Sequence, residues 1–237
     1  MLGILREVDP DLAVSVSLAI GVPVPTGPVE VPPGTSAPGP RGQNGGVTAS
    51  AALSLDNQPR ETIATRKIAM LIAPGFDGEA ASIMRKVLAN HGAIVEVIAP
   101  VLGAIAAEGG AAIEADKTYK TAASVFYDAL FLPGGEQAVV ELEANGNAIH
   151  FIQEAYKHCK PIAALGEAVD LVLLADLEDT ATADGDGSSD DGTDALVSDQ
   201  GVVTARAPEL AGELADAFVI AIAMHRHWSR DVDAIPA

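Results

Sequence analysis

The sequence is short of cysteine, of aromatic residues and of long apolar runs. Cys159 is the only cysteine among 237 residues, which excludes an internal disulfide and a zinc site built from several cysteines. Aromatic residues make up 4% of the chain against 49% hydrophobic residues, so the core must be built mainly from Ala, Val, Leu and Ile. No apolar run reaches the length of a membrane span, and the amino terminus has no signal-peptide pattern. We therefore expect a cytoplasmic protein without a membrane partner.

Basic residues are also scarce. The chain has 14 Lys and Arg against 33 Asp and Glu, and a formal net charge of −19 at pH 7. Such a surface repels phosphate backbones and anionic lipids, so nucleic acid is not expected as a partner. The histidines are scattered or near the carboxyl terminus, and His225 and His227 would point in different directions on a helix. We expect no metal site.

Composition divides the chain into three regions. Residues 1–21 contain a helix signal in which Asp9 is the N-cap, Pro10 opens the helix and Gly21 closes it. Residues 22–65 are rich in Pro and Gly and predict an extended linker. Residues 66–237 form the globular domain. Leu12, Val16 and Ile20 share one face of this helix, which is too small to fold alone. We expect it to pack either on the later domain or on a body missing from this chain.

The globular domain alternates short apolar runs with amphipathic segments. Strands are expected at residues 67–73, 94–98, 129–132 and 162–165. Weaker patterns predict a small hairpin over residues 101–121 and another over 195–204. Helices are expected at residues 79–91, 137–143, 147–158, 167–175 and 208–225. This alternation predicts an α/β fold, a flavodoxin-like doubly wound parallel sheet with three α/β/α layers.

The strand at residues 162–165 ends at a turn where an enzyme of this architecture holds its nucleophile. Gly166 occupies that turn and has no side chain, and Glu167 follows it. No serine or histidine lies just beyond, and Cys159 precedes the strand, where it is expected to be a buried small hydrophobe. The elbow is therefore degenerate, and we expect no catalytic residue in it.

Glycine turns and carboxylates gather at the same edge of the predicted sheet. The turns at residues 74–78 and 132–136 match no phosphate-binding motif. Asp77 or Glu79, together with Glu136 and Glu167, would follow three neighbouring strands. Clustered acids would bind a cation or raise one another's pKa. We favour the other interpretation, in which they cap helix N-termini, where acids are favoured.

An acidic segment covers residues 178–194 and has no Lys or Arg. Asp184, Asp186 and Ser188 match the first, third and fifth ligand positions of a calcium loop. The glycine and the closing glutamate of that loop are replaced by Ser189 and Ala195. We therefore expect a solvated loop here, with a weak cation site as the alternative.

Three stretches are similar to a known family: RKIAMLIAPGFDG, EAYKHCKPIAALGEA and AMHRHWSRDVDAIPA. They resemble the C-terminal domain of large-subunit monofunctional haem catalases, which belongs to the class I glutamine amidotransferase-like group with the PfpI-type proteases. The segment LREVDPDLAVSVSLAIGVPVP resembles the last helix of the catalase core. In the wider superfamily the reactive cysteine would match Gly166. The resemblance implies a vestigial pocket made of Asp77, Glu79, Gly134, Gly135, Glu136 and Gly166.

The resemblance also implies a role. The parent reaction would be the decomposition of hydrogen peroxide to water and oxygen, with the haem in a core domain that this chain lacks. Tyr119, Tyr127 and Tyr156 lie outside the context of a tyrosinate haem ligand, so no cofactor is expected here. The implied partners are the catalase core and its homotetramer, which the domain would stabilise while shaping peroxide access. Two alternatives are chaperone-like binding of unfolded proteins and a residual PfpI-type small-molecule hydrolase.

Overall fold

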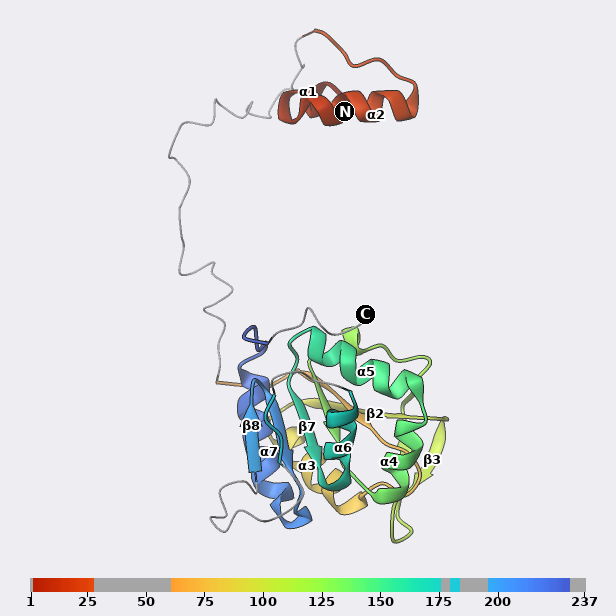
Figure 1. The fold of residues 1–237 in the computed structure, drawn as a ribbon, viewed down its shortest axis with the longest axis vertical. Helices are drawn as coiled ribbons and strands as arrows, with labels where there is room; N and C mark the ends of the chain where they lie inside the picture. Colours follow the sequence, from red (N-terminus) through yellow and green to blue (C-terminus); the bar gives the residue numbers. More distant parts are fainter. Residues whose placement is uncertain (1, 28–60, 176–179, 184–195, 231–237) are drawn as a thin grey trace. The chain divides into compact units, whose positions relative to one another are not determined.

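The computed structural model describes residues 2–27, 61–175, 180–183 and 196–230 (Figure 1). The chain divides into two compact units, residues 1–57 and 58–237, and each is considered by itself. Most of the predicted linker at 22–65 lies outside the described residues. The same holds for most of the acidic segment at 178–194, including its proposed calcium ligands.

The first unit contains α1 (Leu2–Val8) and α2 (Pro10–Ile20). The predicted caps of α2 are confirmed: Asp9 accepts hydrogen bonds from two backbone N–H groups of the first turn, and Gly21 adopts the left-handed conformation. The helix α1 was not expected from the sequence. Ala13 is the buried residue of α2, whereas Leu12 and Ile20 of the predicted apolar face are exposed.

The second unit is built on a seven-stranded sheet with the order β5-β2-β1-β6-β7-β9-β8. Its pairs are parallel except for β8 with β9, which is antiparallel. The strands are β1 (Lys67–Leu71), β2 (Ile94–Ala99), β5 (Lys117–Thr118), β6 (Ala129–Leu132), β7 (Ile162–Leu165), β8 (Leu196–Asp199) and β9 (Val202–Ala205). A separate antiparallel hairpin joins β3 (Gly103–Ala106) to β4 (Ala112–Ala115), as expected for residues 101–121.

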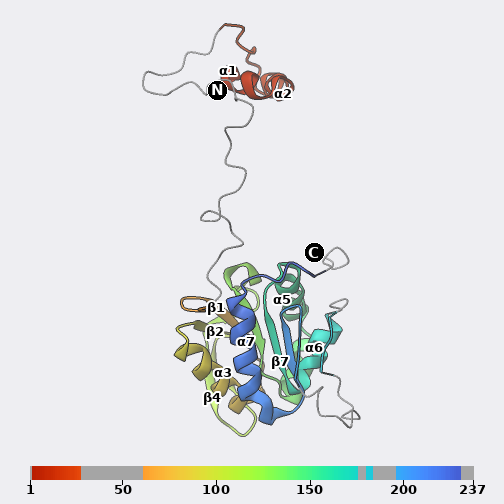
Figure 2. The same ribbon diagram turned by 90° about the vertical axis from the view of Figure 1, so that its left-hand side faces the viewer.

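Helices cover both faces of the sheet. On one face α3 (Gly78–Asn90) packs against α7 (Ala211–Ala223), and on the other α4 (Glu136–Glu143) contacts both α5 (Gly146–Lys157) and α6 (Val169–Leu174) (Figures 1 and 2). The central strands β6 and β7 are buried along their whole length, which explains their uninterrupted apolar sequences. The predicted flavodoxin-like α/β/α fold is confirmed.

Several predicted element boundaries need correction. The first strand ends at Leu71 instead of residue 73, because the chain turns there and the Phe76 N–H bonds the Ala73 carbonyl. The helix expected at 167–175 begins with a 3-10 turn, η3 (Gly166–Ala168), before α6. Another 3-10 turn, η4 (Pro208–Leu210), precedes α7, which ends at Ala223 instead of residue 225.

Beyond α7 the chain runs back along the amino ends of the strands. The His227 N–H donates to the Cys159 carbonyl at 2.9 Å. Arg230 is only 5% exposed, lies over the Tyr156 ring at 4.3 Å and donates to the carbonyls of Gln200 and Tyr156. The tail is therefore fixed to the chain just before β7 and β9. Cys159 is buried at the end of α5, as the sequence predicted.

Candidate functional site

The elbow after β7 is buried and has an unusual backbone conformation. Gly166 lies in η3 with φ +62°, in the left-handed region that side-chain-bearing residues adopt at a cost. A Cβ placed on it would meet nothing closer than the Arg206 carbonyl oxygen at 4.0 Å. The position therefore has space for a small side chain but carries none.

Two other loops meet the elbow. The Asp77 N–H donates to the Gly134 carbonyl at 3.1 Å, which ties the loop after β1 to the loop after β6. The Gly135 N–H donates to Oε2 of Glu167, also at 3.1 Å, which ties the second loop to the elbow. The structure thus brings together four of the predicted site residues: Asp77, Gly134, Gly135 and Glu167.

Two of the carboxylates at this edge make hydrogen bonds that hold the fold. Oδ1 of Asp77 accepts from the backbone N–H groups of Glu79 and Ala80, both at 2.9 Å, so Asp77 caps α3. Oε2 of Glu167 accepts a hydrogen bond from the Gly135 N–H. Glu136 lies in the first turn of α4 and Glu79 in the first turn of α3, where the helix dipole favours acids. The cap at Asp77 agrees with the capping interpretation, whereas the hydrogen bond of Glu167 joins the elbow to another loop.

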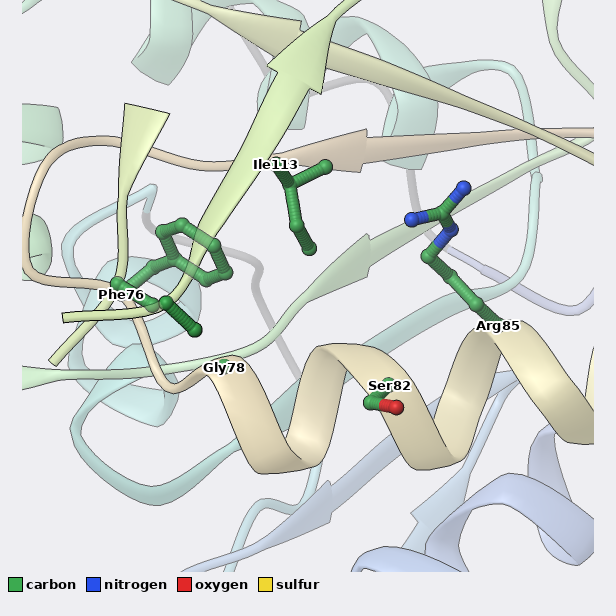
Figure 3. Close-up of a pocket in the computed structure, with 7 residues that line it drawn as sticks. Phe76, Gly78, Ser82, Arg85 and Ile113 are labelled. Carbon is green, nitrogen blue, oxygen red and sulfur yellow. The ribbon is translucent and has the colours of Figure 1, made fainter. Parts of the chain in front are cut away.

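Among the described residues, two cavities adjoin the β3–β4 hairpin, and neither is lined by Gly166, Asp77 or Glu167. The first, of about 270 Å³, lies between α3 and the β3–β4 hairpin (Figure 3). The second, of about 480 Å³, is bounded by the loop after β1 and the hairpin tip and includes Glu136 and Glu108. The sequence did not reveal the first cavity, because a helix and a hairpin far from the elbow form it.

The described residues do not suit a haem. Each tyrosine hydroxyl is already hydrogen-bonded: Tyr119 to the Ile72 carbonyl, Tyr127 to Glu96 at 2.7 Å, and Tyr156 to Thr180. Burial raises the pKa of Tyr119 and Tyr127, which disfavours the tyrosinate form that binds iron. Within the described part of the chain, no three His, Cys, Asp or Glu side chains are grouped so that they could hold a metal ion.

The strongly perturbed ionisable groups lie away from the elbow. Lys160 is 3% exposed just before β7, at the opposite end of that strand from Gly166, and its Nζ donates to the Ser124 carbonyl. Burial, and then the nearby Arg226, lower the pKa of Lys160 to about 8. Hydrogen bonds from Lys117 and Lys67 lower the pKa of Glu96 to about 2. Lys160 and Glu96 therefore belong to the structural framework of the domain and not to the elbow.

None of the helices in the described ranges has the length and apolar character needed to cross a membrane.

Similar solved structures share the fold. A two-domain protein from Anabaena variabilis, with DJ-1/ThiJ/PfpI-like and ferritin-like domains, has a TM-score of 0.58 and 25% identity. That similarity covers 64% of this chain and 48% of the other. A ThiJ/PfpI domain protein from Brachyspira murdochii has a TM-score of 0.59 at 17% identity, covering 66% of this chain and 95% of the other. The second similarity shows the fold alone.

Sequence relatives identify the family. A family model of the C-terminal domain found in long catalases matches residues 64–231. Catalase HPII of Mycobacterium avium is 39% identical over 236 residues, which is 98% of this chain and 30% of the relative. Catalase-2 of Bacillus subtilis is 32% identical over 229 residues, which is 97% of this chain and 28% of the relative. The chain therefore spans less than a third of these relatives, and it belongs to the family of C-terminal domains found in long catalases.

Proposed function

We propose that this domain is a non-catalytic part of a catalase subunit. The observation that carries the proposal is the elbow: Gly166 offers no nucleophile at the position where this architecture places one. The adjacent carboxylate of Glu167 is engaged by the Gly135 N–H, and Asp77 is engaged as a helix cap. Asp77 and Glu167 are thus used in hydrogen bonds that hold three loops together. A residual PfpI-type hydrolase would instead need such carboxylates for its chemistry.

The partner we propose is the haem-containing core of a long catalase and its homotetramer. The parent reaction would be the decomposition of hydrogen peroxide, carried out by the core. The first unit supports this partner, because its helices expose large apolar side chains such as Ile4 at 56% and Leu18 at 79%. Exposed apolar surface of this kind is stabilised by packing on a larger body. In that position the domain would stabilise the tetramer and shape peroxide access.

The non-catalytic role can be tested on the purified chain. We expect that added haem gives no protein-bound Soret band, and that added peroxide releases oxygen no faster than with haem alone. The physical reason is that the three tyrosine hydroxyls are held in hydrogen bonds inside the domain. A stable Soret band together with rapid oxygen release would contradict the proposal.

Neither the family match nor the described geometry favours the chaperone-like or the hydrolase alternative. A separate assay distinguishes the first of them from the proposed role. We expect that the chain at a stoichiometric ratio does not suppress the thermal aggregation of a heat-labile enzyme. Full suppression, undiminished by added salt, would favour the chaperone-like alternative instead.

A further inference from the structure

The hollow between α3 and the β3–β4 hairpin has a defined shape (Figure 3). At its closed end the two elements touch, because a Cβ on Gly78 would lie 2.8 Å from the Cβ of Ala107. Phe76 and Arg85 lie at opposite ends, with Ile113 on the hairpin side and Ser82 on the helix side. The helix and the hairpin therefore diverge from Gly78 and leave a space of about 270 Å³.

Backbone hydrogen bonds hold the walls in place. The Gly75 N–H donates to the Ala106 carbonyl at 2.8 Å, and the Glu108 N–H donates to the Phe76 carbonyl at 2.9 Å. At the other end of the hairpin, the Asp116 N–H donates to the Val97 carbonyl at 2.8 Å, which fixes β4 to β2. The hollow is thus preformed, so a ligand would not have to order the hairpin in order to bind.

The charge of the hollow is opposite to that of the chain. The chain carries a formal charge of −19, yet one arginine and no Asp or Glu lines this space. Within the described ranges, Arg85 has no hydrogen bond or ion pair. The Ser82 hydroxyl is one helical turn away on the same face of α3. A guanidinium without another partner suits a carboxylate, which can accept from two of its N–H groups.

The opposite end of the hollow is apolar. Phe76 is fully buried behind it, and Ala107 and Ile113 complete the wall. A cavity of about 150 Å³ can hold benzene, so about 270 Å³ has room for roughly ten non-hydrogen atoms. We infer that the hollow is a binding site for a small carboxylate with a compact apolar body, with the carboxylate on Arg85 and the body against Ala107 and Ile113. This inference goes beyond the proposed function and does not depend on it.

Benzoate is a suitable probe because it has a flat apolar body and one carboxylate. We titrate benzoate into the full ¹⁵N-labelled chain at constant ionic strength and follow backbone amide shifts. The expected result is saturable binding with a Kd of about 1 mM, as suits a small ligand in a half-open site. The shifted amides should lie in residues 76–85 and 105–113. Benzamide, which has the same shape without the charge, should bind at least about tenfold more weakly.

Variants separate the site from general electrostatics. Arg85→Gln should weaken benzoate binding at least about tenfold, and Arg85→Lys should weaken it less, because it keeps the charge without the two-pronged donor. Lys86→Gln is the matched control: Lys86 is exposed on the same helix and does not line the hollow, so its loss should change the Kd by less than about twofold. Arg85 and Lys86 are both exposed, and far-UV circular dichroism verifies that the variants fold.

Three results would overturn the inference. One is the absence of saturable shifts up to about twenty times the expected Kd. Another is equal binding by Arg85→Gln and the unmodified chain. The third is a shift pattern centred on Lys160 and Arg226, near the amino ends of the strands, instead of on α3 and the hairpin.

Discussion

Two glycines at the elbow should respond very differently to alanine substitution. At Gly166 the backbone has φ +62°, and the nearest atom to a new Cβ would be 4.0 Å away. Alanine in the left-handed region costs about 1 to 2 kcal/mol, and the loss of freedom in the unfolded chain returns about 0.4 to 1 kcal/mol. Gly166→Ala should therefore lower the free energy of unfolding by no more than about 1.6 kcal/mol.

Gly135 has no such space. Its φ is +97°, and a Cβ there would lie 2.9 Å from both the Asp77 nitrogen and the Phe76 Cα, and closer still to the Gly75 carbonyl oxygen. These are backbone atoms of a loop fixed by hydrogen bonds, so they cannot move aside cheaply. Overpacking costs about 1 to 3 kcal/mol and the strained backbone at φ +97° adds to it, so Gly135→Ala should lose about 3 kcal/mol or more.

Urea unfolding followed by far-UV circular dichroism measures the contrast. For an m-value of about 2 kcal/mol/M, the two variants should differ in midpoint by about 0.7 M or more. Equal destabilisation by Gly166→Ala and Gly135→Ala would refute the reasoning. It would mean that the space around Gly166 is as tightly packed as that around Gly135, so that a side chain at Gly166 would require rearrangement.

Three further predictions concern charged side chains. The folded-state pKa of Glu96 is lowered from 4.5 to about 2, so its contribution is present above pH 4.5 and lost as the pH falls towards 2. Glu96→Gln should remove about 1 kcal/mol of the pH dependence of unfolding in that window, after allowance for solvent screening. The pKa of Lys160 is lowered from 10.5 to about 8, so the unfolded chain binds this proton more tightly than the folded chain. The free energy of unfolding should therefore rise between pH 8 and 10.5. Lys160→Met should flatten that rise when urea unfolding is measured across this pH range. Arg230→Ala removes two hydrogen bonds to carbonyls and a contact with the Tyr156 ring. It should lower the free energy of unfolding by about 2 to 3 kcal/mol, which thermal unfolding measures as a lower midpoint. A loss below about 0.5 kcal/mol would show that the tail is not anchored.

The central strands and the caps could be predicted from the sequence because their signals are local. The run Ile162–Leu165 is apolar at every position, and the structure buries it on both faces. Asp77 precedes a helix at the position where a carboxylate can reach the first free N–H groups, and it caps α3. Gly166 follows its strand at a turn, and its positive φ agrees with that placement.

The elements that the sequence missed depend on tertiary contacts. β5 consists of Lys117 and Thr118, which carry no apolar periodicity, and it exists because its backbone pairs with β2. The bond between Glu167 and Gly135 joins residues 32 positions apart. The hollow at Arg85 arises from the angle between a helix and a hairpin, for which the sequence has no pattern.

The proposed role as a stabilising domain is tested most directly in a relative that contains the whole catalase. In Catalase HPII of Mycobacterium avium, the region that matches residues 61–237 of this chain is either deleted or replaced by those residues. Tetramer content is measured by analytical ultracentrifugation during heating, alongside oxygen release from peroxide. We predict that deletion lowers the temperature at which tetramer and activity are lost, and that replacement restores most of it. An unchanged dissociation temperature after deletion, or a replacement that restores nothing, would contradict the proposed role.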